Sequence, residues 1–147
     1  MPARKTALQK AVDYLARREH SRHELRHKLA DRDYTETEID QALQRLQEKD
    51  LQSDERFASS YVSSRYDRGH GPYKIIMELK QRGVDEHMAT DIVYDEQYDW
   101  FDKALQVYEK KYGSSEISDY NDRLKRSRFL QQRGFSTEHI QYAMTQT

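Results

Sequence analysis

A helical pattern recurs in this chain at intervals of about 50 residues, and this repeat restricts the possible folds more than any other feature. Equivalent positions of the three copies carry Leu29, Leu79 and Leu130, followed four residues later by Asp33, Gly83 and Gly134. A helix that ends there needs a residue that tolerates a positive φ, which Gly supplies and Asp accepts better than most. A unit of about 45 residues buries too little apolar surface to be stable alone, so we expect neighbouring units to stack.

The residues around these turns predict helices. Ser21 with Glu24 and Thr35 with Glu38 form capping boxes ahead of apolar residues at helical spacing. Pro72 suits the first turn of another helix. The 147 residues include only five Gly and two Pro, which argues against a β fold with its many turns. Hydrophobic residues make up 35% of the chain, which predicts a thin core.

These signals together predict an all-α fold. We expect three tandem three-helix repeats, each resembling a helix-turn-helix, stacked into an elongated, curved rod. The predicted units are residues 1–51, 52–96 and 97–147. The likeness to a helix-turn-helix is architectural and does not by itself establish DNA binding.

The charges lie in alternating blocks, although the net charge is only −1. Residues 1–30 carry eight Lys/Arg against three Asp/Glu, and residues 31–60 carry four against nine. Residues 84–102 hold seven acids and no Lys or Arg. Because the apolar residues keep helical spacing, this pattern predicts folded helices with separate basic and acidic surfaces.

Several classes of protein are excluded by what the sequence lacks. The chain has no Cys, which excludes a disulfide scaffold, a thiol nucleophile and a Cys-ligated zinc site. No apolar run approaches the roughly 18 residues of a membrane span, and the first residues have no signal-peptide character. We therefore expect a cytoplasmic protein that does not contact a membrane.

The string from His23 to His27 reads H-E-x-x-H, the pattern in which two His on one helical face bind zinc. Glu24 is already explained by the capping box, and Arg26 places a positive charge inside the motif. No third ligand follows downstream. We expect no metal here, and a metal-dependent hydrolase remains only a rival hypothesis.

The loop from Gly69 to Lys74 leaves two interpretations open. It joins two helices and starts the second, so its unpaired N–H groups and Lys74 would suit a phosphate or an acidic side chain. It would equally suit a tight turn between helices. Elsewhere the sequence shows no nucleophile–base pair and no Gly-rich nucleotide fingerprint, so we expect that the protein is not an enzyme.

Three stretches of the chain resemble the RecX family of RecA regulators. The middle one is the most specific: F-A-x(3)-V-x(2)-R begins at Phe57, and G-x-G-P-x(2)-I-x(2)-E-L-x(2)-R-G-V begins at Gly69. The other two run from Tyr14 to Leu29 and from Arg128 to Phe135. The match as a whole covers nearly the entire chain.

The resemblance implies a protein of three three-helix units that binds the RecA filament on single-stranded DNA. Such proteins lodge in the helical groove of the filament and limit its extension, ATP hydrolysis, strand exchange and coprotease activity. They also bind DNA weakly. No catalytic residue and no cofactor are implied. We expect a monomeric negative regulator whose partners are the RecA filament and, through electrostatic contacts, single-stranded DNA.

Charge and position within these motifs predict two groups of contact residues. The central group comprises Arg65, Arg68, His70, Lys74 and Arg82. The second group comprises Arg126, Arg128 and Arg133. A stand-alone helix-turn-helix DNA-binding protein is the alternative, but it needs a recognition helix that suits the major groove. The predicted third helix of the second unit, residues 85–94, is acidic and suits it poorly.

Overall fold

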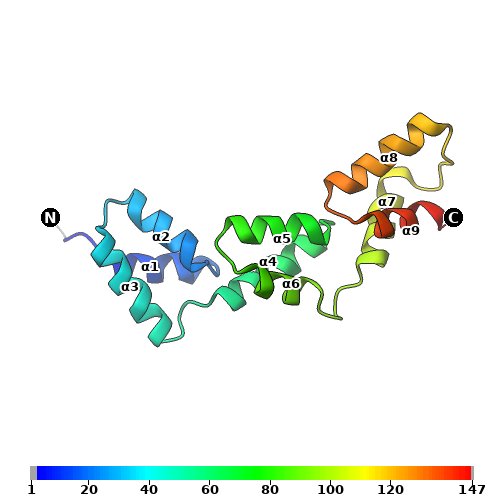
Figure 1. The fold of residues 1–147 in the computed structure, drawn as a ribbon. Helices are drawn as coiled ribbons and strands as arrows, with labels where there is room; N and C mark the ends of the chain where they lie inside the picture. Colours follow the sequence, from blue (N-terminus) through cyan, green and yellow to red (C-terminus); the bar gives the residue numbers. More distant parts are fainter. Residues whose placement is uncertain (1–2, 147) are drawn as a thin grey trace.

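The computed structural model describes residues 3–146, which form nine α-helices and no β-strand. The helices form three consecutive groups of three, arranged as an elongated arc with the termini at opposite ends (Figure 1). The first group contains α1 Ala7–Arg17, α2 Arg22–Asp31 and α3 Glu36–Glu48. The second contains α4 Asp54–Asp67, α5 Pro72–Gln81 and α6 Glu86–Val93. The third contains α7 Trp100–Tyr112, α8 Tyr120–Gln132 and α9 Thr137–Thr145. The all-α prediction is confirmed.

The helix starts follow from local sequence. Both capping boxes predicted from the sequence are present, with Ser21 accepting from the Glu24 N–H and Thr35 from the Glu38 N–H. A further capping box at Thr6 begins α1. Within the described residues, no helix is both long and apolar enough to cross a membrane.

The turn between the second and third helices is the same in all three groups. Asp33, Gly83 and Gly134 have φ of 65°, 81° and 99°. The next N–H in each group bonds back to the carbonyl of the repeated leucine, at 3.3, 3.0 and 3.2 Å. This is the Schellman arrangement, in which a left-handed residue ends the helix and satisfies its last carbonyls.

The apolar core is divided unequally along the arc. The first group has its own core, built from Leu25, Leu29, Leu43 and Leu46 among others. The second and third groups share one continuous core, which runs from Phe57 to Met144. We expected neighbours to shield one another's apolar faces, and this holds for the second junction. The first junction is instead polar.

Both junctions use the same contact between neighbouring groups. The turn of the later group meets the start of the second helix of the earlier group. At the first junction the Ser21 hydroxyl donates to the Arg82 carbonyl at 2.7 Å. At the second, the Gly71 N–H donates to the Arg133 carbonyl at 2.6 Å. Ser21 and Gly71 each precede the first residue of their helix, so the two contacts are equivalent.

The turn glycines allow this close approach. A β-carbon at Gly83 would collide with the His23 side chain, and one at Gly134 would collide with the β-carbon and backbone nitrogen of Lys74. Gly71 is equally constrained, because a β-carbon there would collide with the Gly134 backbone. These glycines serve the packing of the groups as well as the backbone conformation.

Candidate functional site

The structure regroups the basic residues predicted from the sequence. Arg68 of the central group and Arg133 of the second group meet at the second junction, where the Arg133 guanidinium donates to the Arg68 carbonyl at 3.4 Å. Three lysines of α7 join them and complete a cleft of about 420 Å³, which we call the junction cleft. Its cations are Arg68, Lys103, Lys110, Lys111 and Arg133.

The junction cleft is strongly positive. Among the described residues that line it, Asp67 alone carries a carboxylate. Within residues 3–146, none of the five cations belongs to an ion pair. Unpaired charges in a concave surface focus the local potential and attract an anion. The arrangement therefore suits a phosphate backbone or an acidic protein surface.

Two aromatic rings contact the cations of this cleft: Phe129, which lines it, and Tyr66, which lies outside its lining. The Lys111 ammonium lies 4.2 Å from the centre of the Phe129 ring, and the Arg133 guanidinium lies 5.4 Å from it. Lys103 lies 4.3 Å from the centre of the Tyr66 ring. Such contacts hold charged groups in place without neutralising their charge. Because cations cover these ring faces, the cleft suits phosphates better than stacked bases.

The positive surface continues along α8. Lys111 and Phe129 also line a neighbouring hollow, together with Lys125 and Arg128. Arg128 thus belongs to the same surface as Arg133, as the sequence grouping predicted, although in a separate hollow.

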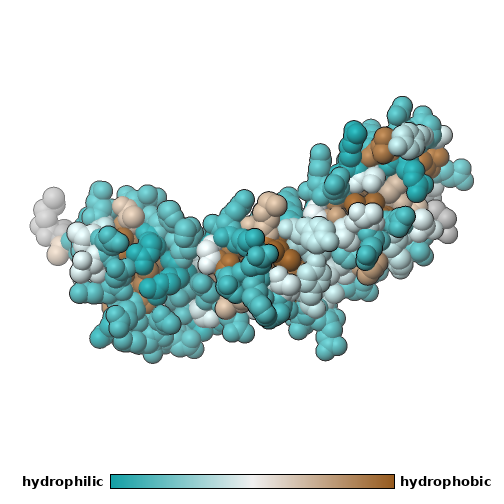
Figure 2. Space-filling model, viewed as in Figure 1, coloured by the Kyte–Doolittle hydropathy of each residue, from teal (hydrophilic) through white to brown (hydrophobic). Residues whose placement is uncertain are grey.

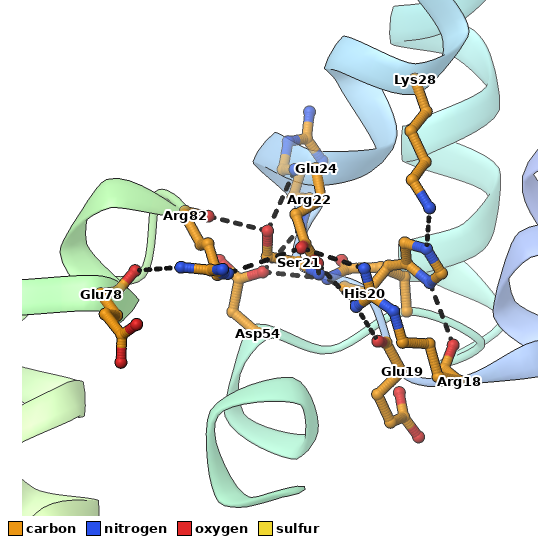
Figure 3. A network of polar contacts seen from close by, with 11 residues as sticks. Arg18, Glu19, His20, Ser21, Arg22, Glu24, Lys28, Asp54, Glu78 and Arg82 are labelled. Carbon is orange, nitrogen blue, oxygen red and sulfur yellow. Dashed lines mark hydrogen bonds and ion pairs between the residues drawn. The ribbon is translucent and has the colours of Figure 1, made fainter. Parts of the chain in front are cut away.

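The cleft at the first junction differs because carboxylates neutralise it. Arg65 and Arg82 lie 4.4 and 4.9 Å from the centre of the Tyr61 ring. Glu24 pairs with Arg18 at 3.1 Å and with Arg82 at 3.8 Å, as part of the network in Figure 3. Burial opposes the ionisation of Glu24, but its hydrogen bonds to Arg18 and the Ser21 N–H outweigh this and lower the pKa of the carboxyl. The positive potential of this cleft is therefore weaker.

Arg126 does not lie on the surface, so it is unsuited to the partner contact expected of it. Its side chain is buried, and its guanidinium donates to the Tyr108 hydroxyl and the Ser115 carbonyl, both at 2.8 Å. It also pairs with Asp122 at 3.1 Å. Arg126 occupies the core position that Leu25 and Ile75 fill in the other groups, and it ties the loop between α7 and α8 to both helices.

The loop from Gly69 to Lys74 is a junction element. The Gly71 and Tyr73 N–H groups at the start of α5 donate to carbonyls of the third group, at 2.6 and 3.0 Å, and are not free for an anion. Of the two interpretations, the structure favours the tight turn. His70 is half-buried, and burial and Lys74 lower the pKa of its ring. Lys74 packs closely against Gly134, where a β-carbon would collide with the Lys74 backbone nitrogen and β-carbon.

The H-E-x-x-H string does not form a metal site in this structure. The His23 and His27 rings are adjacent, with centroids 4.4 Å apart. Glu24 is engaged by arginines and its own helix start, as described above. In the described part of the chain, no group of three or more His, Asp or Glu is placed to hold a metal ion.

Sequence reasoning missed the three lysines of α7. Lys110 and Lys111 follow Lys103 by seven and eight residues, which is about two helical turns, so the three lysines lie on one side of α7. That spacing was readable from the sequence. Their meeting with Arg68 and Arg133 was not, because it depends on how the second and third groups pack.

Comparison with known proteins gives a consistent picture. Family models described as the first, second and third three-helix domains of RecX match residues 7–46, 53–91 and 97–144. A regulatory protein RecX from Chromohalobacter salexigens is 41% identical over 134 residues, which cover 91% of this chain and 88% of that protein. One from Halorhodospira halophila is 38% identical over 90% of this chain and 83% of its own length.

A solved structure has the same architecture. The crystal structure of RecX from Lactobacillus salivarius aligns with a TM-score of 0.78 at 27% identity. The alignment covers 94% of this chain and 92% of that one.

Proposed function

This chain belongs to the RecX family, and from that premise we propose that it is a negative regulator of RecA. It binds the RecA filament on single-stranded DNA and lodges in the helical groove. There it limits filament extension, ATP hydrolysis, strand exchange and coprotease activity. It acts as a monomer and without a cofactor, by binding rather than by catalysis.

The junction cleft is the observation that carries this proposal furthest. An elongated arc of three helical groups suits a helical groove, and the cleft gathers at one point along it five cations that have no ion pair within residues 3–146. We assign the main contact with phosphates or acidic filament surface to these five residues, with Arg128 extending it along α8. Arg65 and Arg82 flank this contact. His70 and Lys74 stabilise the junction beside it. Arg126 stabilises the fold of the third group.

The alternative of a stand-alone helix-turn-helix DNA-binding protein is less well supported. The helix that follows the repeated turn would have to enter the major groove. In the second group this helix is α6, which carries Glu86 and Asp91 and no Lys or Arg. Carboxylates on that helix would be repelled by the phosphates that line the groove.

The test is the ATPase activity of RecA on single-stranded DNA at substoichiometric amounts of this protein. We expect inhibition by the wild type, and we expect Arg68→Glu to raise the half-inhibitory concentration about tenfold or more. Arg45→Glu is the matched control, since Arg45 is exposed on α3, far from the cleft in sequence, and outside any described ion pair. Circular dichroism checks that both variants fold.

The outcomes separate the two parts of the proposal. If the wild type leaves the RecA ATPase unchanged, the proposed function is wrong. If the wild type inhibits and Arg68→Glu inhibits equally well, the assignment of the junction cleft is wrong. Protection of a discrete duplex site in footprinting would favour the helix-turn-helix alternative.

A further inference from the structure

A second surface lies on the middle group, outside the lining of the junction cleft. Tyr73 and Met77 stand one helical turn apart on α5 and are 56% and 61% exposed. Tyr94, at the end of α6, is 48% exposed. The helices α5 and α6 run in opposite directions, so the start of α5, with Tyr73, and the end of α6, before Tyr94, lie on the same side of the group (Figure 1). Burial raises the pKa of Tyr94 and Tyr73 raises it further, in agreement with this placement. We call these three residues the tyrosine patch.

The tyrosine patch lies in the most acidic part of the chain. Seven exposed carboxylates stand between the start of α6 and the start of α7: Asp85, Glu86, Asp91, Asp95, Glu96, Asp99 and Asp102. Only Glu86 pairs with a lysine, Lys80, at 3.3 Å in the described part of the chain. Asp91 lies 3.2 Å from the exposed His87.

The two lysines of α5 offset these carboxylates only in part. Lys80 is paired with Glu86, and Lys74, which is half-buried, is the other lysine of this helix. The visible face of the middle group shows hydrophobic atoms surrounded by hydrophilic ones (Figure 2). No described residue of α5 or α6 lines the junction cleft, although the backbone of Tyr73 bonds to Gly134, the neighbour of the cleft residue Arg133.

The residue types of the tyrosine patch favour a protein as its binding partner. Tyrosine and methionine are enriched where proteins bind one another, because large amphipathic side chains give contact area at low entropic cost. A Lys or Arg of a partner would find both a tyrosine face and a carboxylate within reach. A phosphate backbone would be repelled by the same carboxylates.

We propose that the tyrosine patch docks a protein segment in which Lys or Arg side chains alternate with aliphatic ones. Resting on the proposed function, we assign this segment to RecA. The molecule then contacts the filament through two surfaces of opposite charge. The tyrosine patch holds a basic protein surface, while the junction cleft holds phosphates.

The test uses the full-length double variant Tyr73→Ser/Tyr94→Ser. Both side chains are about half exposed, and circular dichroism checks that the variant folds. We expect its affinity for RecA without DNA, measured by biolayer interferometry, to fall about tenfold or more. Its binding to a fluorescent single-stranded oligonucleotide, measured by anisotropy, stays at the wild-type level. Arg68→Glu/Lys111→Glu gives the reverse pattern. Tyr120→Ser is the control, because Tyr120 is 71% exposed on α8 and outside the patch.

Three results overturn the inference while leaving the proposed function intact, provided that the wild type inhibits RecA. The first is unchanged RecA binding by the double variant. The second is a loss of oligonucleotide binding, which would make the patch a nucleic-acid surface. The third is a wild-type dimer in sedimentation that the double variant abolishes, which would make a second copy of the chain the occupant. Failure of the wild type to inhibit RecA overturns the proposed function itself, and with it the assignment of the segment to RecA.

Discussion

At the scale of single residues, His20 is held in its neutral form. Its side chain is buried, with Nδ1 3.0 Å from the Arg18 carbonyl and Nε2 2.8 Å from the Lys28 ammonium (Figure 3). The carbonyl requires a proton on Nδ1, and the ammonium requires a lone pair on Nε2. A second proton on the ring would therefore break the contact with Lys28. Burial lowers the pKa of His20, and the nearby Arg18 and Lys28 charges lower it further.

This arrangement predicts that stability falls on mild acidification. The unfolded chain takes up a proton on His20 near its ordinary pKa of about 6.5, whereas the folded chain resists it. The unfolded state thus binds more protons, and the free energy of unfolding decreases as the pH falls through that value. His70 and His139 act in the same direction, since burial lowers the pKa of each.

Urea unfolding at about pH 7.5 and about pH 5.5 measures this effect. We expect a lower midpoint at the acidic pH for the wild type, and a smaller decrease for His20→Gln. His87→Gln, at an exposed histidine, is the surface control. An unchanged difference between the two pH values in His20→Gln would contradict the role given to His20. Glu24 does not interfere, because its pKa is lowered and its protonation belongs to a more acidic range.

The burial of the Arg126 side chain could not be predicted from the sequence. Its charge led us to expect a partner contact, although it stands in register with Leu25 and Ile75, which are buried. The core placement is the one found. A guanidinium can be buried only if its donors are satisfied, and here Tyr108, Ser115 and Asp122 satisfy them. These partners come from two helices and a loop, so only the assembled fold brings them together.

At the scale of helices and turns, the sequence was most informative. The capping boxes and the residues with positive φ are local features, decided by side chains within four residues of one another. They were therefore predictable. The contact between the turn of one group and the helix start of its neighbour joins residues about 60 positions apart, such as Ser21 and Arg82. Nothing in the local sequence specifies that contact.

Ser21 and Thr35 offer a direct measure of this contact. Both begin a helix through a capping box with a Glu, but only Ser21 also donates to a neighbouring group. We expect Ser21→Ala to cost about 2–3 kcal/mol and Thr35→Ala about 1 kcal/mol, because the first also leaves the Arg82 carbonyl without its partner. Urea unfolding measures both. Equal costs would mean that the bond between the groups contributes nothing.

At the scale of the whole molecule, a net charge near zero coexists with one strongly basic and one strongly acidic region. The molecule has a net charge of −1, yet the junction cleft collects five cations and the stretch from α6 to α7 collects seven carboxylates. The alternating blocks of the sequence predicted separate surfaces. They did not predict where the surfaces lie, because the basic one combines residues from α4, α7 and the turn after α8. The inequality of the two junctions, one polar and one apolar, was likewise not predictable from the repeat.

The salt dependence of oligonucleotide binding tests this distribution. If all five cations of the junction cleft contact phosphates, affinity for single-stranded DNA should fall about a hundredfold between roughly 50 mM and 200 mM salt. Arg68→Ala should reduce the slope of log affinity against log salt by about 0.7, while Arg45→Ala leaves it unchanged. A response that is flat in the wild type would mean that the cleft binds protein alone.

The contact that joins the groups is directional, because a turn always meets the helix start of the group before it. Contacts of this kind add copies without limit unless they close into a ring or one end is blocked. The free turn at the N-terminal end carries Asp33, where the joined turns carry Gly83 and Gly134. A β-carbon would collide at those glycines, so Asp33 does not fit the contact that Gly83 and Gly134 make. The series of identical contacts between groups therefore has a defined first member, and the N-terminal turn differs from the two that follow it in the residue on which the contact depends.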